Sequence, residues 1–158
     1  MPDAIAKATI REVEPLRGED PVGEGARRII AEDLPALPVV DEKGEFIGIF
    51  GEREFMKALF PGYVGELSSA RVVSRDIDSV IERREGCRAE PVSEHMTTDH
   101  VVVEDDYSDT ELAEIFLHHR VLIVPVATEG KVHALITRND FFRELARKLA
   151  ESPEDVGA

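Results

Sequence analysis

Cysteine is almost absent from this sequence, with Cys87 as its single copy. One cysteine cannot form an internal disulfide, and chains of this kind are typical of a reducing compartment, so we expect a cytoplasmic protein. No apolar run approaches the roughly 20 residues of a membrane-spanning helix. Residues 1–4 show no basic segment followed by an apolar one, so we expect no secretory signal and no membrane association.

Basic residues are also scarce, because 19 lysines and arginines stand against 33 aspartates and glutamates, for a formal net charge of −14. Such a charge opposes binding to the phosphate backbone of nucleic acids. The acids gather at residues 104–114, where no basic residue interrupts them. A solvated face with helix-start acids accounts for this cluster. A divalent-cation site is the alternative, although the glycine and the spaced oxygen ligands of a calcium loop are missing.

Motifs that carry catalysis are missing as well. The chain has no glycine-rich phosphate loop, no plausible nucleophile–base pair and no metal-ligand spacing. His118 and His119 are adjacent, so on a helix they point about 100° apart and cannot chelate one ion. His95 and His100 have no cysteine or carboxylate at ligand spacing. We therefore expect neither an enzyme nor a metal site, and no required cofactor.

What the chain does contain is an internal repeat. Residues 24–40 match residues 111–127 at a shift of 87, and four pairs are identical: Glu24/Glu111, Ala26/Ala113, Pro38/Pro125 and Val39/Val126. One residue is then lost in a turn, and the match resumes at a shift of 86 with Gly44/Gly130. A repeat of this kind indicates a duplicated supersecondary unit whose copies pack on each other. Two copies are too few for a solenoid, so we expect a closed module with two lobes.

Each copy is predicted to fold as strand, helix, strand, strand and helix. In the first copy Asp20 is predicted to cap a helix that has Pro21 at its first position. Spacing of i, i+4, i+7 and i+8 predicts that this helix has one apolar face, formed by Val22, Ala26, Ile29 and Ile30. Strands are predicted at residues 37–40 and 46–50, and a closing helix at 52–60.

The second copy follows the same plan. A capping box that begins at Ser108 is predicted to start its first helix. Strands are predicted at residues 122–126 and 132–136. Apolar side chains recur along both helices of this copy: Ala113, Phe116 and Leu117 on the first, and Phe141, Leu145 and Leu149 on the last.

The two copies are separated by a segment that is too long for a plain connector. It carries Val73, Ile77, Val80 and Ile81 at helical spacing, and Gly86 is predicted to end that helix. We expect an ordered inserted helix rather than a loose linker. Its apolar stripe would cap the module or meet another subunit.

A hydroxyl and a carboxylate lie at the start of the last helix. Thr137 follows a predicted strand, and Asp140 comes three residues later. A helix N-terminus offers unpaired N–H groups and a dipole that favours an anion. Thr137 can add a hydroxyl to a phosphate, and Asp140 can accept both hydroxyls of a ribose. Because Thr-x-x-Asp is also a common capping pattern, an ordinary helix cap is the alternative.

The whole pattern resembles a tandem pair of CBS (cystathionine-β-synthase) domains, also called a Bateman module. Each copy in that family has a Pro-Val-Val-Asp-x-x-Gly hairpin and a Gly-h-x-[Thr/Ser]-x-x-Asp motif, where h is apolar. The hairpins stand here at residues 38–44 and 125–130, and the closing motifs at 48–54 and 134–140. The resemblance assigns residues 8–60 to repeat 1, 61–90 to an inserted helical linker, 91–150 to repeat 2 and 151–158 to a frayed tail.

The resemblance implies an α/β (α+β) fold in which two β-α-β-β-α repeats pack with pseudo-two-fold symmetry. It also implies a non-catalytic sensor module that binds AMP, ADP, ATP or S-adenosylmethionine in a cleft between the repeats and biases their packing. The ligand-binding residues carried over by position are Thr137, Asp140, Val124, Pro125, Thr98 and Val101.

The first copy departs from the family pattern. Gly51 replaces the hydroxyl residue and Glu54 the aspartate, so the cleft that includes Pro38 and Gly48 is expected to be degenerate. In the second copy Ala134 replaces the glycine, which adds a methyl group where a ligand approaches. The resemblance therefore implies one usable cleft at most.

The resemblance also implies a homodimer, since CBS pairs commonly dimerise through their helices. The alternative function is a constitutive dimerisation or scaffold module that binds no small molecule. In that case its acidic surface and inserted helix would dock an unknown basic protein partner.

Overall fold

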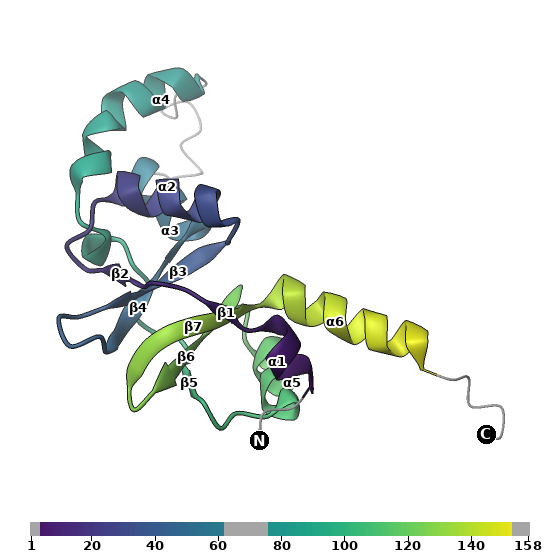
Figure 1. The fold of residues 1–158 in the computed structure, drawn as a ribbon. Helices are drawn as coiled ribbons and strands as arrows, with labels where there is room; N and C mark the ends of the chain where they lie inside the picture. The colour runs from purple at the N-terminus through teal and green to yellow at the C-terminus, as the bar shows by residue number, and fades with distance from the viewer. Residues whose placement is uncertain (1–3, 62–75, 153–158) are drawn as a thin grey trace. The chain divides into compact units, whose positions relative to one another are not determined.

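The computed structural model describes residues 4–61 and 76–152, and the chain divides into two compact units. Unit 1 combines Met1–Glu14 with Val101–Ala158, and unit 2 is Pro15–His100. Figure 1 traces the chain through both units. The chain leaves unit 1 after Glu14 and returns to it at Val101, so the compact units are offset from the sequence repeats.

Unit 2 is built on a three-stranded sheet with the order β2-β3-β4. β2 (Leu16–Arg17) pairs in parallel with β3 (Ala36–Val40), and β3 pairs antiparallel with β4 (Phe46–Gly51). Every residue of β3 is buried, which is typical of a strand covered on both faces. In the turn between β3 and β4, Gly44 adopts a φ of 83°, a left-handed conformation that glycine takes at no steric cost.

Two helices of unit 2 follow the predicted plan, α2 (Val22–Glu32) and α3 (Glu52–Leu59). The predicted cap was wrong, because Pro21 is the N-cap of α2. The Asp20 carboxylate instead accepts a hydrogen bond from the backbone N–H of Arg17 at 2.9 Å. The predicted apolar face was also wrong at one position, since Ile30 is 80% exposed.

The segment between the repeats contributes the predicted ordered helix, α4 (Ile77–Arg84). Val80 is buried on it, whereas Ile77 and Ile81 are exposed. Val73 lies outside the described residues. Gly86 was expected to end the helix, but it lies inside a 3-10 turn, η2 (Glu85–Ala89), that continues from it. A second 3-10 turn, η3 (Val92–Glu94), follows.

Unit 1 contains a four-stranded sheet with the order β1-β7-β6-β5. β6 (Ile123–Thr128) pairs antiparallel with β7 (Lys131–Thr137) and in parallel with β5 (Val103–Glu104). α5 (Asp109–His118) follows β5, and α6 (Arg138–Glu151) follows β7. Both units therefore have the predicted order of strand, helix, strand, strand and helix, and the predicted α/β fold is confirmed.

The sheet of unit 1 gains an extra edge from the N-terminal end of the chain. β1 (Arg11–Glu12) pairs antiparallel with β7, where Arg11 lies opposite Leu135. The equivalent feature of unit 2 is an antiparallel bridge between Thr97 and Ile49. Both pairs are related by the repeat shift of 86. Each sheet is thus extended by the segment that precedes the other repeat in the sequence.

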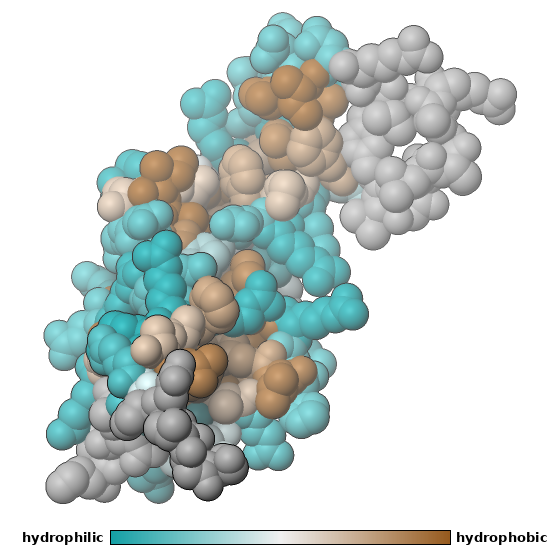
Figure 2. All heavy atoms as spheres, turned by 90° about the vertical axis from the view of Figure 1, so that its right-hand side faces the viewer, coloured by the Kyte–Doolittle hydropathy of each residue, from teal (hydrophilic) through white to brown (hydrophobic). Residues whose placement is uncertain are grey.

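The helices of unit 1 bury fewer apolar side chains than the sequence predicted. Ser108 caps α5 as predicted, since its Oγ accepts from the N–H of Glu111 at 3.0 Å. Leu112 and Phe141 are buried, but Leu117 and Leu149 are each 80% exposed. In Figure 2 hydrophobic residues reach the surface at several places among hydrophilic ones. No helix within residues 4–61 and 76–152 is long and apolar enough to cross a membrane.

Candidate functional site

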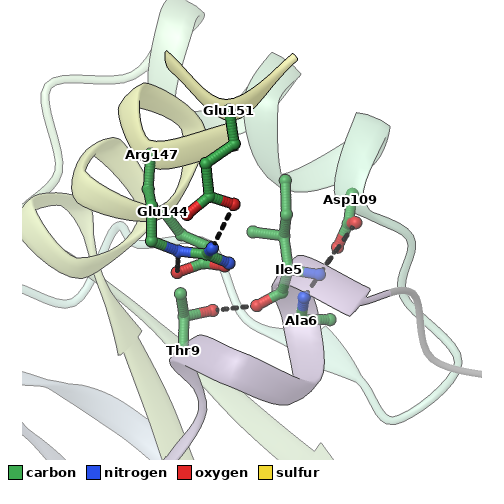
Figure 3. Close-up of polar contacts among 7 residues, drawn as sticks. All are labelled: Ile5, Ala6, Thr9, Asp109, Glu144, Arg147 and Glu151. Carbon is green, nitrogen blue, oxygen red and sulfur yellow. Dashed lines mark hydrogen bonds and ion pairs between the residues drawn. The ribbon is translucent and has the colours of Figure 1, made fainter. Parts of the chain in front are cut away.

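A short helix packs the N-terminal segment of unit 1 against the rest of that unit. α1 (Ala4–Thr9) packs on α5 and α6. The backbone N–H groups of Ile5 and Ala6 donate to the two carboxylate oxygens of Asp109 at 3.2 and 2.8 Å, and the Thr9 hydroxyl donates to the Ile5 carbonyl at 2.6 Å (Figure 3). Asp109 thus accepts from N–H groups that a helix start leaves unpaired. This contact positions β1, which follows directly.

β1 brings an arginine to the predicted ligand-binding acid. Arg11 donates from Nε to Oδ2 of Asp140 at 2.7 Å and from Nη2 to Oδ1 at 3.0 Å. This is the bidentate geometry in which a guanidinium binds a carboxylate most strongly. The Arg11 side chain is 39% exposed and that of Asp140 is 23% exposed. The carboxylate predicted to accept ribose hydroxyls therefore already accepts from a guanidinium, in a pair that solvent reaches.

Thr137 is the N-cap of α6. Its Oγ1 accepts a hydrogen bond from the backbone N–H of Asp140 at 3.0 Å, and the residue is buried. The alternative of an ordinary helix cap is therefore confirmed for this hydroxyl. Its predicted contact with a ligand stays a prediction.

The remaining predicted ligand residues divide between the units. Val124 and Pro125 are buried on β6, and the β5–β6 ladder pairs only Val126 and Ala127, so both lie beyond it. Val101 is half-buried in unit 1, whereas Thr98 belongs to unit 2. Unit 1 thus contains five of the six predicted positions, and Thr98 is the one that it does not contain.

The equivalent acid of repeat 1 is enclosed by protein groups. Glu54 is 4% exposed. Its Oε1 accepts from the N–H of Gly51 at 2.9 Å, and its Oε2 accepts from the Thr97 hydroxyl at 2.6 Å. The extra methylene of Glu54 lets this carboxylate reach back to its own N-cap. Both oxygens therefore have partners inside unit 2.

Close packing explains the glycines of the first closing motif. A Cβ on Gly51 would lie 2.5 Å from Cβ of Ala36 and 2.6 Å from the Pro35 carbonyl oxygen. A Cβ on Gly48 would lie 2.8 Å from both Sδ of Met96 and the Thr97 carbonyl oxygen. A hydroxyl side chain cannot occupy position 51 without moving the neighbouring backbone. Pro38 is buried on β3 opposite Ile49, and the degenerate first cleft stays a prediction.

Sequence reasoning missed Arg11 and Thr97. They contact the acids Asp140 and Glu54, and both pairs are related by the same shift of 86. That shift, extended to the segment before each repeat, was the available signal. No local pattern indicates that the segment before each repeat joins the sheet of the other repeat.

Two acids of residues 104–114, Asp105 and Asp109, have separate hydrogen-bond partners. The pKa of Asp105 lies below its usual value, first because the Thr128 hydroxyl donates to it and then because His133 lies beside it. His133 Nε2 is 3.2 Å from Asp105 Oδ1 and 2.8 Å from Thr128 Oγ1. Asp109 binds α1 and does not join this group. The alternative of a divalent-cation site is therefore not supported by any convergence of these acids among the described residues.

A different set of ionisable side chains does converge in unit 2. One ligand atom each of Glu90, Glu94 and His95 lies within 4.8 Å of the others. The expectation that His95 has no carboxylate at ligand spacing was wrong, because the η3 turn brings both glutamates to its ring.

A surface pocket of about 550 Å³ opens in unit 2 beside the turn between β3 and β4. That turn is at the end of the sheet away from Gly51. The pocket wall carries three carboxylates and one ammonium group, those of Glu19, Asp41, Glu42 and Lys43. An excess of negative charge opposes a phosphate at this position.

Comparison with known proteins assigns the family. A family model described as "CBS domain" matches residues 5–61 and 92–147. The chain belongs to the CBS-domain family. The two matched segments correspond to the two copies found in the sequence, so the chain is a tandem CBS pair.

Several CBS proteins of known structure share this fold. A CBS-domain protein from Agrobacterium tumefaciens is 24% identical, with a TM-score of 0.62 over 85% of this chain and 90% of its own. A putative acetoin utilization protein (AcuB) from Vibrio cholerae is 18% identical, with a TM-score of 0.69 over 97% of this chain and 99% of its own.

Two further relatives are a solved structure with a bound nucleotide and a protein that is similar in sequence. CBSX2, solved in complex with AMP, is 19% identical with a TM-score of 0.62, over 89% of this CBS pair and 93% of its own chain. An uncharacterized 17.7 kDa protein of Acidianus ambivalens is 24% identical over 146 residues, which are 92% of this chain and 74% of that protein. At these identities the solved structures establish the fold of the CBS pair.

Proposed function

We propose that this CBS pair is a non-catalytic regulatory module that binds a phosphorylated adenine nucleotide at Arg11, Thr137 and Asp140. The observation that carries the proposal is the contrast between the two equivalent acids. Asp140 is partly exposed and held by a charged partner, whereas Glu54 is buried with both oxygens bonded inside unit 2. A ligand could therefore reach only the acid of repeat 2.

The ion pair supports a phosphate-bearing ligand in particular. Ribose hydroxyls that bind Asp140 would displace the Arg11 guanidinium, which lies at bidentate distance from the same oxygens. A phosphate matches the fork of donors that a displaced guanidinium presents. S-adenosylmethionine carries a cationic sulfonium and lacks a phosphate, so we rank it below AMP, ADP and ATP. A solved CBS neighbour, CBSX2, is in complex with AMP.

The N-terminal end of α6 adds to the same argument. Asp140 lies in its first turn, and Thr137 caps it. Backbone N–H groups and the helix dipole favour a negative charge there. Arg11 and this helix start thus place hydrogen-bond donors for a phosphate side by side in a chain whose net charge is −14.

Thermal unfolding in the presence of AMP, ADP, ATP, S-adenosylmethionine, NAD and adenosine tests the proposal. A ligand at 100 times its Kd adds about 2.7 kcal/mol of stability, which raises the Tm of a chain of this size by about 5–10 °C. We expect at least one phosphorylated nucleotide to raise the Tm and Asp140→Asn to abolish the rise. Glu151→Gln is the matched control, because it removes an arginine-paired acid from the exposed end of the same helix.

Arg11→Ala separates the two parts of the site. It removes the proposed phosphate contact and also uncovers Asp140. We therefore expect AMP to lose its advantage over adenosine, while adenosine binding is retained. An AMP affinity that is unchanged in both Arg11→Ala and Asp140→Asn would contradict the proposed site.

A second function, a constitutive dimerisation or scaffold module, is favoured by a separate observation. Two pairs of exposed apolar residues occupy equivalent helix positions in the repeats. Ile30 and Leu117 are each 80% exposed, and Met56 and Phe142 are 53% and 63% exposed. Retention of apolar residues at matching exposed positions supports a homodimer contact through these helices. No Tm shift with any nucleotide, together with a stable dimer, would favour the scaffold.

A further inference from the structure

We propose that Glu90, Glu94 and His95 form a binding site for a borderline divalent metal ion, of which Zn²⁺ is the best fit. The three ligand atoms lie within 4.8 Å of one another. The site belongs to unit 2 and shares no residue with Arg11, Thr137 or Asp140. It therefore stands independently of nucleotide binding.

The local backbone presents these side chains on a fixed turn. Glu90 ends the η2 turn, and its carbonyl accepts from the N–H of Val22 at 2.8 Å. The N–H of Val92 donates to the Asp20 carbonyl at 2.8 Å, and the N–H of His95 donates to the Val92 carbonyl at 2.9 Å. Glu90 and Val92 are therefore anchored to the residues that begin α2, and residues 92–95 form a tight turn.

Two of the three ligands are already in place relative to each other. His95 Nε2 lies 2.8 Å from Glu90 Oε1, and their side chains are 17% and 34% exposed. Tetrahedral Zn²⁺ with bonds of about 2.0–2.1 Å separates its donors by about 3.3 Å. Coordination would replace this hydrogen bond by two bonds to a shared ion. The exposed Glu94 side chain would then close the site with a movement of about 1.5 Å, from at most 4.8 Å.

A neighbouring arginine sets the charge of the cluster. Arg84 Nη2 lies 3.6 Å from Glu90 Oε1. Its Nε and Nη2 also donate to the Ala58 carbonyl at 3.2 and 2.7 Å, which fixes the guanidinium on the α3 side. Arg84 offsets the charge of one carboxylate, so Glu90 and Glu94 together keep one net negative charge that attracts a cation while both supply an oxygen ligand.

The donor set decides the class of metal. Mg²⁺ and Ca²⁺ take oxygen ligands almost exclusively, whereas an imidazole nitrogen with two carboxylates suits Zn²⁺ and Co²⁺. Three protein ligands leave one tetrahedral position to water. The ion would tie residue 90 to residue 95, directly before Met96 and Thr97, which contact Gly48 and Glu54. It would thereby stiffen the segment that extends the unit 2 sheet.

Titration of the metal-free full chain with Co²⁺, followed by Zn²⁺ competition, tests the site. We expect visible d–d absorption that saturates at one ion per chain and is lost on addition of Zn²⁺. Glu94→Gln and His95→Gln should each lower the Zn²⁺ affinity at least about tenfold, since even outer-shell changes cost that much. Glu85→Gln should bind like the wild type, because it removes an exposed acid of the same segment that pairs only loosely with Arg88, at 3.8 Å.

Further variants distinguish binding at this site from misfolding and from binding by other histidines. Glu94→Gln changes an exposed side chain, so a loss of affinity in this variant cannot come from misfolding if its circular dichroism is native. The double variant His118→Gln/His119→Gln should keep the Co²⁺ spectrum. Slower hydrogen exchange at the Thr97 N–H with Zn²⁺ would support the stiffening. Wild-type affinity in both Glu94→Gln and His95→Gln, or equal binding of Mg²⁺, would overturn the proposal.

Discussion

At the scale of single residues, space rather than side-chain chemistry explains the departure of the first closing motif from the family pattern. A Cβ on Gly51 would lie only 2.6 Å from the carbonyl oxygen of Pro35 and 2.5 Å from the methyl group of Ala36. For Gly86, in the η2 turn, no heavy atom of the described residues other than its chain neighbours and its own turn lies within 4 Å of the position of such a Cβ. The two glycines therefore tolerate a methyl group to different degrees.

Gly51→Ala is expected to destabilise the protein by about 1–3 kcal/mol, because overpacking forces the neighbouring backbone to shift. Urea unfolding followed by circular dichroism measures the change. Gly86→Ala is the matched control and should stay within about 0.5 kcal/mol of the wild type. Equal stability of the two variants would mean that strands β3 and β4 are less closely packed at position 51 than these contact distances indicate.

At the scale of elements, α1 is held by a residue from far along the chain. Asp109, at the start of α5, accepts from two N–H groups of α1 over a separation of more than 100 residues. Because β1 follows α1 directly, this contact also determines where Arg11 lies. The link between α1 and α5 therefore supports the ion pair of the candidate site.

Asp109→Ala is expected to release α1, because both N–H groups lose their acceptor. A lost acceptor costs about 1–3 kcal/mol where the donors stay buried, and less where α1 detaches into water. Hydrogen exchange at Ile5 and Ala6 should therefore accelerate more than exchange in β6. Glu114→Ala changes an exposed acid of the same helix and should leave exchange at both amides unaltered, because Asp109 is their acceptor. Uniform acceleration over unit 1 would contradict a local role.

At the scale of the whole molecule, the exposed apolar residues are relevant to assembly. Leu117 on α5 and Phe142 on α6 have equivalents in Ile30 on α2 and Met56 on α3. Each unit thus has one helix pair with the same two positions apolar and exposed. A closed two-fold dimer would bury such self-complementary positions.

The double variant Leu117→Glu/Phe142→Glu is expected to shift the proposed homodimer towards monomer, because buried carboxylates lack partners in an apolar contact. Sedimentation equilibrium measures the shift. Ile77→Glu, on the exposed side of α4, is the contrasting variant and should leave assembly intact. A monomer from Ile77→Glu alone would transfer the contact to the inserted helix instead.

Much of the fold was predictable, because it depends on local patterns that occur twice. The buried run of β3, the Gly44 turn and the Ser108 cap each follow from a few neighbouring residues. Errors arose where burial depends on partners remote in the sequence. Ile30, Leu117 and Leu149 fit a helical apolar stripe, yet they are exposed, because no described element of their own unit covers that face.

The candidate site was only half predictable for the same reason. Thr137 and Asp140 belong to one motif, and their spacing indicates a helix start whatever surrounds it. Arg11 and Thr97 reach the two acids only because each unit exchanges a segment with the other repeat. Glu90, Glu94 and His95 converge because the chain winds into 3-10 turns there.

The sequence by itself determined the duplication, the order of strands and helices, and the family. These depend on hydrophobic periodicity, on turn residues and on the internal repeat, all of which can be read directly from the order of the residues. Tertiary structure alone decided that Arg11 binds Asp140 while Glu54 is enclosed, and that His95 meets two glutamates. Side chains from distant segments become neighbours only when the sheets form, so no local pattern of residues contains those contacts.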